Sequence, residues 1–264
     1  MGEARSVSEG EATGAGSFRT RRNFTQAAVK TAAAGAAALT VANAPKQAAA
    51  ACFLKGTRIR TVTGECDVED LGIGDVLPTA SGDVQTVQLV GNYAFFKDSR
   101  AQSWAEGVRP VRISRSAISD GVPCRDLYLS QYHSLLVDGA LVSAGTLVNG
   151  TTIVQVDPRD LQELAYFHIK LARHDVIFAE GAPCESLLKI DENADNFAEY
   201  VRRYGRPVTD ERPCAPVLAF NGTRGEVASR LRSAISPWLD LRRPLDVIRD
   251  RIEERGLAMA RAGS

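Results

Sequence analysis

The chain changes character at residue 52, where it reads CFLKGTRIRTVTGECDVEDLGIGDVL through residue 77. Residues 57–62 alternate between polar and apolar side chains, and residues 63–65 read as a turn. Alternation of this kind predicts a half-buried β-strand, and Gly64 and Gly74 fit the turns that separate such strands. The stretch therefore opens a β-domain.

The same texture continues for most of the chain. Further strand candidates share short length, alternation and flanking turn residues: 84–92, 108–115, 125–130, 134–142, 151–156, 164–171 and 174–179. No helix is predicted before about residue 191, which argues against a parallel βαβ fold. The predicted fold class is mainly β, with one all-β domain over 52–190 and a small helical extension over 191–264.

Length and composition exclude several classes of function. The 264 residues suffice for one large domain or two smaller ones. Lys and Arg number 32, as do Asp and Glu, so no global positive field draws the chain to nucleic acid. The five cysteines form no CxxC pair, so neither a disulfide framework nor structural zinc is predicted. No metal or organic cofactor has support in the sequence.

Residues 1–51 form a leader of different composition. The run Thr20-Arg21-Arg22-Asn23-Phe24 precedes an alanine-rich stretch at 27–44 and the small residues 48–51. A charged region, a weakly apolar region and a small-residue cleavage zone are the order of an export signal. The apolar part is too short and weak for a stable membrane span.

The paired arginines of the leader resemble the twin-arginine export signal of bacteria. We therefore expect the protein to be exported to the periplasm or the cell exterior. The alternatives for this segment are a disordered alanine-rich tail and an organelle transit peptide.

Three segments in a fixed order resemble a known family. Cys52 opens CFLKGTRI, residues 129–136 read LSQYHSLL, and residues 166–181 read YFHIKLARHDVIFAEG. Together they resemble the Hint superfamily, which includes inteins and the C-terminal domains of hedgehog proteins, and most of all its bacterial members. The resemblance implies a Hint-type, pseudo-symmetric all-β fold. It also implies an autoprocessing domain that attacks the peptide bond on its own N-terminal side.

The same resemblance implies roles for individual residues. Cys52 would attack the carbonyl of Ala51 in an N-to-S acyl shift, as a thiolate if its surroundings lower the thiol pKa. His133 would protonate the departing nitrogen, and Ser130 would hydrogen-bond the peptide or its oxyanion. The product would be a thioester, which an unidentified second nucleophile, such as water or a thiol, would open.

The C-terminal side of the domain departs from the intein pattern. Inteins finish with His-Asn followed by Cys, Ser or Thr, whereas residues 181–186 read GAPCES. Complete splicing is therefore not expected, and the chain's own N-terminal segment is the expected substrate of a single-turnover cleavage or transfer. His174 or Asp175 would activate the second nucleophile, with His168 as a partner.

Cys52 also admits other interpretations, as an inert core residue or as a lipid-modified cysteine. Moreover, a signal peptidase that cut after Ala51 would leave Cys52 no upstream carbonyl to attack. The alternative function is a non-catalytic exported β-domain with a role in interaction.

The C-terminal extension is expected to be helical. Apolar residues at helical spacing predict helices at 193–204, 227–235 and 244–255, with Gly256 as the stop of the last. These amphipathic helices would pack on the β-domain or on a protein partner. Their arginines are interleaved with acidic residues, which favours a solvated surface over nucleic-acid binding.

Overall fold

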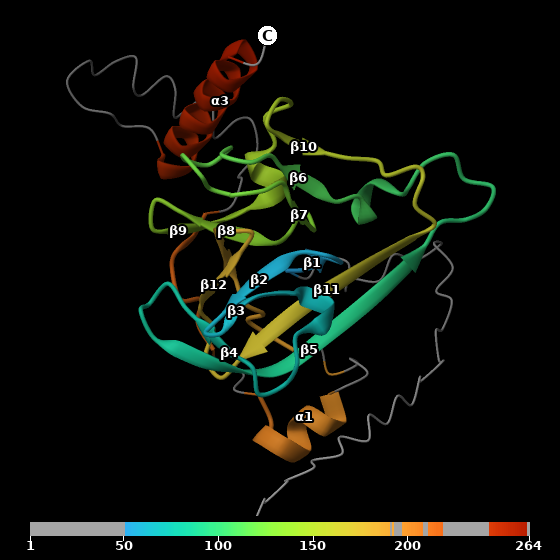
Figure 1. Ribbon diagram of the computed structural model, residues 1–264, viewed down its shortest axis with the longest axis vertical. Coiled ribbons are helices and arrows are strands. Elements are labelled where there is room, and N and C mark those ends of the chain that lie inside the picture. The colour runs from blue at the N-terminus through green and yellow to red at the C-terminus, as the bar shows by residue number, and fades with distance from the viewer. Residues whose placement is uncertain (1–50, 191, 193–196, 208–210, 219–242, 263–264) are drawn as a thin grey trace, which may run out of the picture. The chain divides into compact units, whose positions relative to one another are not determined.

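The computed structural model describes residues 51–190, 192, 197–207, 211–218 and 243–262 (Figure 1). Over these residues the protein is mainly β, with two seven-stranded sheets, and the predicted fold class is confirmed. The leader and the helix predicted at 227–235 lie outside the described residues.

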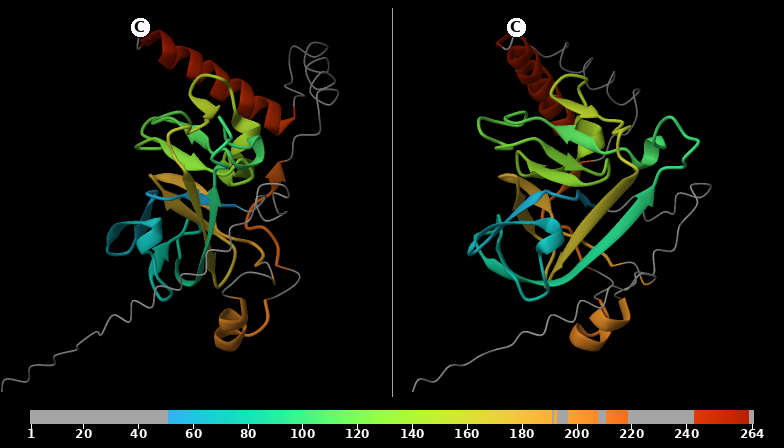
Figure 2. Two further views of the ribbon diagram at one scale, coloured as in Figure 1. Left: turned by 90° about the vertical axis from the view of Figure 1, so that its right-hand side faces the viewer. Right: turned by 45° about the vertical axis from the view of Figure 1, so that its right-hand side comes forward.

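The first sheet has the strand order β10-β6-β7-β1-β11-β5-β4. In chain order its strands are β1 (Phe53–Leu54), β4 (Val76–Pro78), β5 (Val84–Phe96), β6 (Val111–Ile113), β7 (Leu127–Leu129), β10 (Ile153–Gln155) and β11 (Glu163–Leu171). The antiparallel pair of β5 and β11 forms the long ribbon seen in all three views (Figures 1 and 2). The two-residue strand β1 lies between β7 and β11, where Phe53 faces both Leu129 and Phe167 in the register.

The second sheet has the order β14-β9-β8-β13-β12-β2-β3. Its strands are β2 (Arg58–Thr61), β3 (Gly64–Asp67), β8 (Ser134–Val137), β9 (Ala140–Ser143), β12 (Val176–Ala179), β13 (Ala182–Glu185) and β14 (Val217–Leu218). The turn predicted at 63–65 is shorter than expected, because Gly64 already pairs with Thr61 as the first residue of β3. Short 3-10 helices cover Val68–Asp70, Glu106–Val108 and Ala144–Leu147.

The main hydrophobic core takes its side chains from both sheets. Phe53 and Ile169 come from the first sheet, and Ile59 and Leu135 from the second, and all four are essentially inaccessible to solvent. Burial of each such side chain contributes roughly 1.5–3 kcal/mol. The alternating strand pattern therefore fixes which face of each strand points inward.

The extension contributes two helices and a strand. Helix α1 covers Phe197–Tyr204, and helix α3 covers Pro244–Ala262 and buries Leu245, Ile248 and Ile252 in the main core. The predicted packing of the last helix on the β-domain is thus confirmed. The extension is not purely helical, however, because β14 adds to the second sheet as a parallel neighbour of β9. Among the described helices, none is both long and apolar enough to span a membrane.

Helix α3 does not stop at Gly256, as the sequence predicted, but continues to Ala262. The glycine is there for packing, because a Cβ atom at this position would lie 2.4 Å from Thr151 Oγ1 and 2.9 Å from Asn149 Nδ2. The amide of Asn149 is held by the N–H of Ile153 and the carbonyl of Ile252, so it cannot withdraw easily.

The substitution Gly256→Ala tests whether close packing against Thr151 and Asn149 requires a glycine at this position. In an isolated helix alanine would stabilise by about 1 kcal/mol relative to glycine, but here we expect a lower Tm because the methyl group would push α3 away from Thr151. Thermal unfolding followed by circular dichroism measures the effect. Glu253→Ala, at an exposed position of the same helix, is the control and should change Tm little; a higher Tm for Gly256→Ala would contradict the packing argument.

Candidate active site

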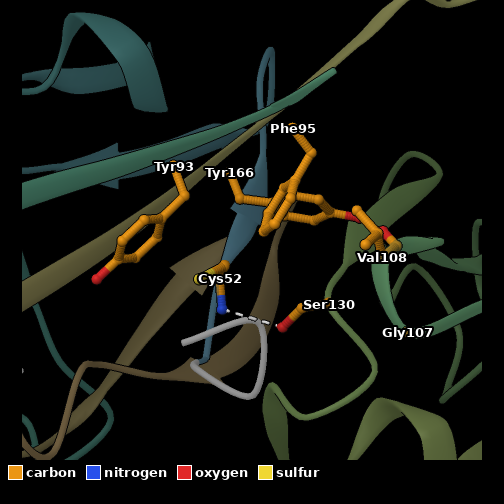
Figure 3. A pocket seen from close by; sticks show the side chains of 7 residues that line it. All are labelled: Cys52, Tyr93, Phe95, Gly107, Val108, Ser130 and Tyr166. Atoms are coloured by element: carbon orange, nitrogen blue, oxygen red, sulfur yellow. Dashed lines mark hydrogen bonds between the residues drawn. The ribbon is translucent and has the colours of Figure 1, made fainter. Parts of the chain in front are cut away.

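Cys52 lies immediately before β1 and is buried. Its amide N–H donates a hydrogen bond to Ser130 Oγ at 3.2 Å, and its carbonyl accepts the N–H of Ser130 at 3.0 Å (Figure 3). The two bonds attach residue 52 to the turn that follows β7. The nitrogen of the Ala51–Cys52 peptide bond therefore contacts a hydroxyl group.

A small pocket opens beside Cys52 and Ser130. Its remaining walls are mainly aromatic and apolar and come from Tyr93, Phe95, Gly107, Val108 and Tyr166. The hydroxyl of Tyr166 donates to the Val108 carbonyl at 2.7 Å and so fixes one wall (Figure 3). The thiol thus adjoins a small, mainly apolar space that offers its charged form little stabilisation.

The environment of Cys52 disfavours a thiolate. Burial raises the pKa of Cys52 to about 12. The sequence predicts a thiolate only if the surroundings of Cys52 lower the pKa of its thiol. The structure does not show that lowering. At neutral pH the side chain is a thiol, and it can act as a nucleophile only if a nearby base removes its proton.

His133 is the imidazole nearest to this position. It is fully buried, and its ring lies 4.3 Å from that of Phe53, centroid to centroid. The N–H of His133 donates to the Ser130 carbonyl at 3.1 Å, so a tight turn brings the two predicted residues together. Sequence spacing of three residues predicted this proximity.

The tautomer of His133 follows from its hydrogen bond. Nε2 lies 3.1 Å from the carbonyl oxygen of Glu185, which can only accept, so Nε2 carries the proton and Nδ1 has the lone pair. Burial lowers the pKa of His133, although the Glu185 charge and the backbone of Cys52 partly oppose this. The imidazole contacts the backbone of Cys52, and a neutral imidazole is a suitable proton acceptor.

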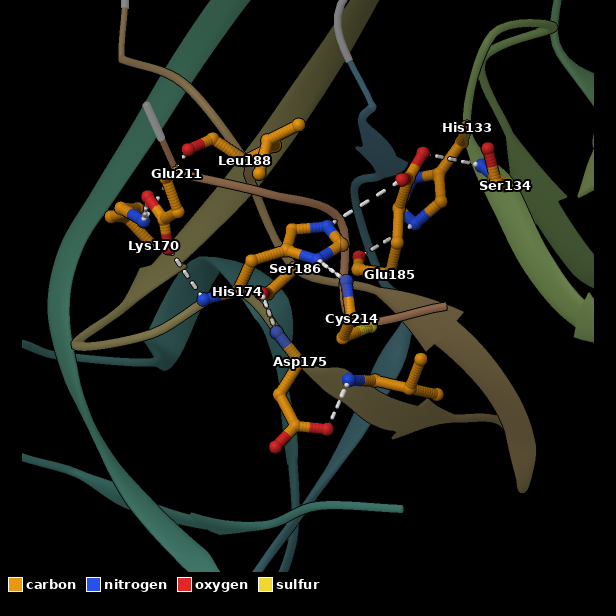
Figure 4. Close-up of polar contacts among 11 residues, drawn as sticks. His133, Ser134, Lys170, His174, Asp175, Glu185, Ser186, Leu188, Glu211 and Cys214 are labelled. Carbon is orange, nitrogen blue, oxygen red and sulfur yellow. Dashed lines mark hydrogen bonds and ion pairs between the residues drawn. The ribbon is translucent and has the colours of Figure 1, made fainter. Parts of the chain in front are cut away.

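Glu185 is a residue of this site that the sequence analysis missed. Its carboxylate accepts the N–H of Ser134 at 2.8 Å, and Oε2 lies 3.7 Å from His174 Nε2 (Figure 4). Burial raises the pKa of Glu185, but contacts with His174, His133 and Ser134 outweigh burial and hold the pKa below its usual value. A partly buried carboxylate thus lies between two imidazoles. Its only signal in the sequence was the single acidic residue within residues 182–187.

The other predicted residues lie around this group without joining Cys52. His174 faces Glu185, and its Nδ1 accepts the N–H of Cys214 at 3.0 Å. Asp175 instead accepts hydrogen bonds from Ser81 Oγ at 2.7 Å and Gln85 Nε2 at 3.0 Å. Burial raises the pKa of Asp175, but these hydrogen bonds outweigh it and lower the pKa.

His168 occupies a separate place on β11. Its ring lies 5.2 Å from that of Tyr93 and stands over Gly91, where a Cβ atom would collide with Nε2. Burial lowers the pKa of His168 to about 4, so the side chain is neutral. The structure therefore groups Cys52, Ser130 and His133, and it connects His174 to them only through Glu185. Among the described residues, no cluster of three or more His, Cys, Asp or Glu side chains could hold a metal ion.

A family model described as the Hint domain matches residues 51–191, more than half of the chain. The chain belongs to the Hint domain family. No curated protein matches the sequence.

Several solved intein structures are similar to this chain. The crystal structure of the MchDnaB-1 intein has 15% identity and a TM-score of 0.34, and the match covers 50% of this chain and 98% of the intein. The gp41-1 intein has 14% identity and a TM-score of 0.34 over 50% of this chain and 97% of the intein. A DnaB intein from Synechocystis sp. PCC 6803 has 11% identity and a TM-score of 0.34 over 52% of this chain and 98% of the intein.

The environment of the cysteines predicts their order of alkylation. Cys124 and Cys214 are exposed, whereas Cys52 and Cys184 are buried, and the raised pKa of Cys52 leaves few reactive thiolates. In native protein treated with iodoacetamide at pH 8, we expect Cys52 to react about a hundredfold or more slowly than Cys124. Peptide mass mapping over time measures both rates, and denatured protein is the control in which the difference should disappear. Equal rates in the native protein would contradict the buried, protonated state of Cys52.

Proposed function

We propose that this protein is an autoprocessing domain that breaks its own Ala51–Cys52 peptide bond through a thioester on Cys52. The observation that carries the proposal is the hydrogen bond of 3.2 Å from the Cys52 amide to Ser130 Oγ, beside the buried imidazole of His133. A nucleophile, a group on the scissile nitrogen and a neutral base then adjoin one peptide bond. Membership of the Hint family supports autoprocessing as the kind of reaction.

The first step is an acyl shift from nitrogen to sulfur. His133 Nδ1 removes the proton of the Cys52 thiol, and Sγ attacks the carbonyl carbon of Ala51. The C–N bond of the tetrahedral intermediate then breaks, and His133 returns the proton to the Cys52 nitrogen. The products are a thioester joining Ala51 to Sγ and a free α-amino group on Cys52, so the step consumes no proton overall.

Ser130 and Glu185 support this step in different ways. Ser130 Oγ accepts the amide N–H and so orients the nitrogen that must receive a proton. The Glu185 carboxylate favours the imidazolium that forms on His133, because an opposite charge in a buried place acts strongly. The two groups therefore assist the leaving nitrogen and the transferred proton.

The pocket beside Cys52 gives the second nucleophile its access. Its walls are mainly apolar and Cys52 itself lines it, so a nucleophile in the pocket would meet the thioester. Attack on the thioester carbonyl breaks the C–S bond, restores the Cys52 thiol and releases residues 1–51. We further propose that the leader, with its twin-arginine-like run at 20–24, directs export of the protein before the cleavage releases it.

Intact mass of purified full-length protein tests the cleavage. We expect wild type to lose residues 1–51, faster with dithiothreitol, because the thiol opens the thioester. Cys52→Ala should abolish the loss, His133→Ala should slow it about 10²- to 10⁴-fold, and Ser130→Ala should slow it about tenfold. Cys184→Ala is the matched control, since that thiol is buried in the core. Full-length mass in every sample would reject autoprocessing and leave a non-catalytic domain.

The pH dependence of cleavage distinguishes two ways to activate the thiol. With neutral His133 as the base, the rate at saturating dithiothreitol rises through the pKa of His133, which burial holds below 6.5, and is then constant. With thiolate formed by solvent, the rate would continue to climb about tenfold per pH unit toward the Cys52 pKa of about 12. We expect the constant rate from about pH 7 to 9; a continued climb would exclude His133 as the base.

A further inference from the structure

A segment outside the Hint domain contacts His174, the residue that faces Glu185. Residues 211–218, here called the strap, lie beyond the matched range of 51–191. The end of the strap is β14, which pairs with β9, and the carbonyl of Pro216 accepts the N–H of Leu141 at 2.8 Å. The sheet thus holds one end of the strap in a defined register.

A buried ion pair holds the other end. Glu211 Oε2 lies 2.6 Å from Lys170 Nζ, and Glu211 Oε1 accepts the backbone N–H of His174 at 2.6 Å (Figure 4). Lys170 is only 2% exposed, so it needs this carboxylate, because an unpaired buried charge costs several kcal/mol. One side chain of the strap thereby fixes the backbone at His174.

Between these two anchors the strap contacts the His174 ring. The backbone N–H of Cys214 donates to His174 Nδ1 at 3.0 Å. An Nδ1 atom that accepts a hydrogen bond bears no proton, so the proton is on Nε2. That Nε2–H faces Glu185 Oε2 at 3.7 Å, a distance that a small movement of either side chain would shorten to a hydrogen bond.

We propose that the strap completes the processing site, with His174 as a positioning residue that the Cys214 N–H holds in its Nε2–H tautomer. The inference rests on the proposed function. In the opposite tautomer, the lone pair of Nε2 would face the Glu185 carboxylate and repel it. The carboxylate of Glu185 would then move away from His133, on which its charge acts. The backbone carbonyl of the same Glu185 accepts the Nε2–H of His133. Cleavage at residue 52 therefore requires residue 214 to be docked.

Two substitutions at one position test the proposal in the full-length chain. Cys214→Pro removes the N–H that His174 accepts, whereas Cys214→Ala changes the side chain and keeps the N–H. We expect the loss of residues 1–51, followed by intact mass in dithiothreitol, to be at least about tenfold slower in Cys214→Pro than in Cys214→Ala. Equal rates in two variants of equal Tm would overturn the proposal.

A spectroscopic measurement reads the tautomer without any cleavage. The chain has three histidines, and long-range ¹H–¹⁵N correlation spectra of histidine-labelled protein distinguish protonated from unprotonated ring nitrogens. In a Cys52→Ala background we expect His174 to be the Nε2–H tautomer, also with Cys214→Ala, and to change with Cys214→Pro. A tautomer unchanged by Cys214→Pro would overturn the role of the strap.

A second pair of variants keeps the test decisive if Cys214→Pro does not fold. His174→Gln retains an N–H donor near the position of Nε2, and His174→Ala does not. We expect His174→Gln to process at least about fivefold faster than His174→Ala, and equal rates would reject positioning by His174. If wild type itself does not cleave, the proposed function fails, and the tautomer spectra alone decide whether the strap sets His174.

Discussion

The two-residue strand β1 is the constraint on which the site depends. Phe53 pairs at once with Leu129 of β7 and Phe167 of β11, so three segments far apart in the sequence meet at residue 53. Because Cys52 precedes this pairing directly, its backbone lies against the turn at Ser130 and His133. A shift of β1 by one residue would exchange the faces of Phe53 and Leu54 and remove Phe53 from the core. The core thus determines where the thiol lies.

Burial has opposite and complementary effects on the two reacting groups. It raises the pKa of Cys52 and lowers that of His133, so the thiol and the imidazole are both neutral at rest. Transfer of the proton would create two charges in an apolar place, which is costly. In the proposed acyl shift, the nearby carboxylate of Glu185 would offset part of that cost for the imidazolium.

The sequence predicted features that depend on neighbouring residues. It failed for features that depend on contacts between residues far apart in the chain. Alternation located most strands, and the spacing of Ser130 and His133 placed both in one turn. Glu185 escaped notice because its role depends on β13 lying beside β8, which no periodicity shows. Gly256 was misread as a helix stop because its close neighbour, Thr151, is more than a hundred residues away in the chain. Asp175 could not be told from His174 as a site residue, because both lie in the connection between β11 and β12, where no periodicity predicts the direction of a side chain.

The charged side chains of Lys170, Glu211 and Glu185 are difficult to explain by stability alone. A buried ion pair such as Lys170 with Glu211 contributes little on balance, because desolvation cancels much of the attraction. Well-packed apolar residues could join the extension to the β-domain at lower cost, as Leu245 and Ile248 of α3 do. What the charged groups add is direction: Glu211 and the N–H of Cys214 orient one imidazole, which faces one carboxylate. This polar network specifies the orientation of side chains from the extension to His133. The proposed proton transfer requires such an orientation, whereas a hydrophobic core does not.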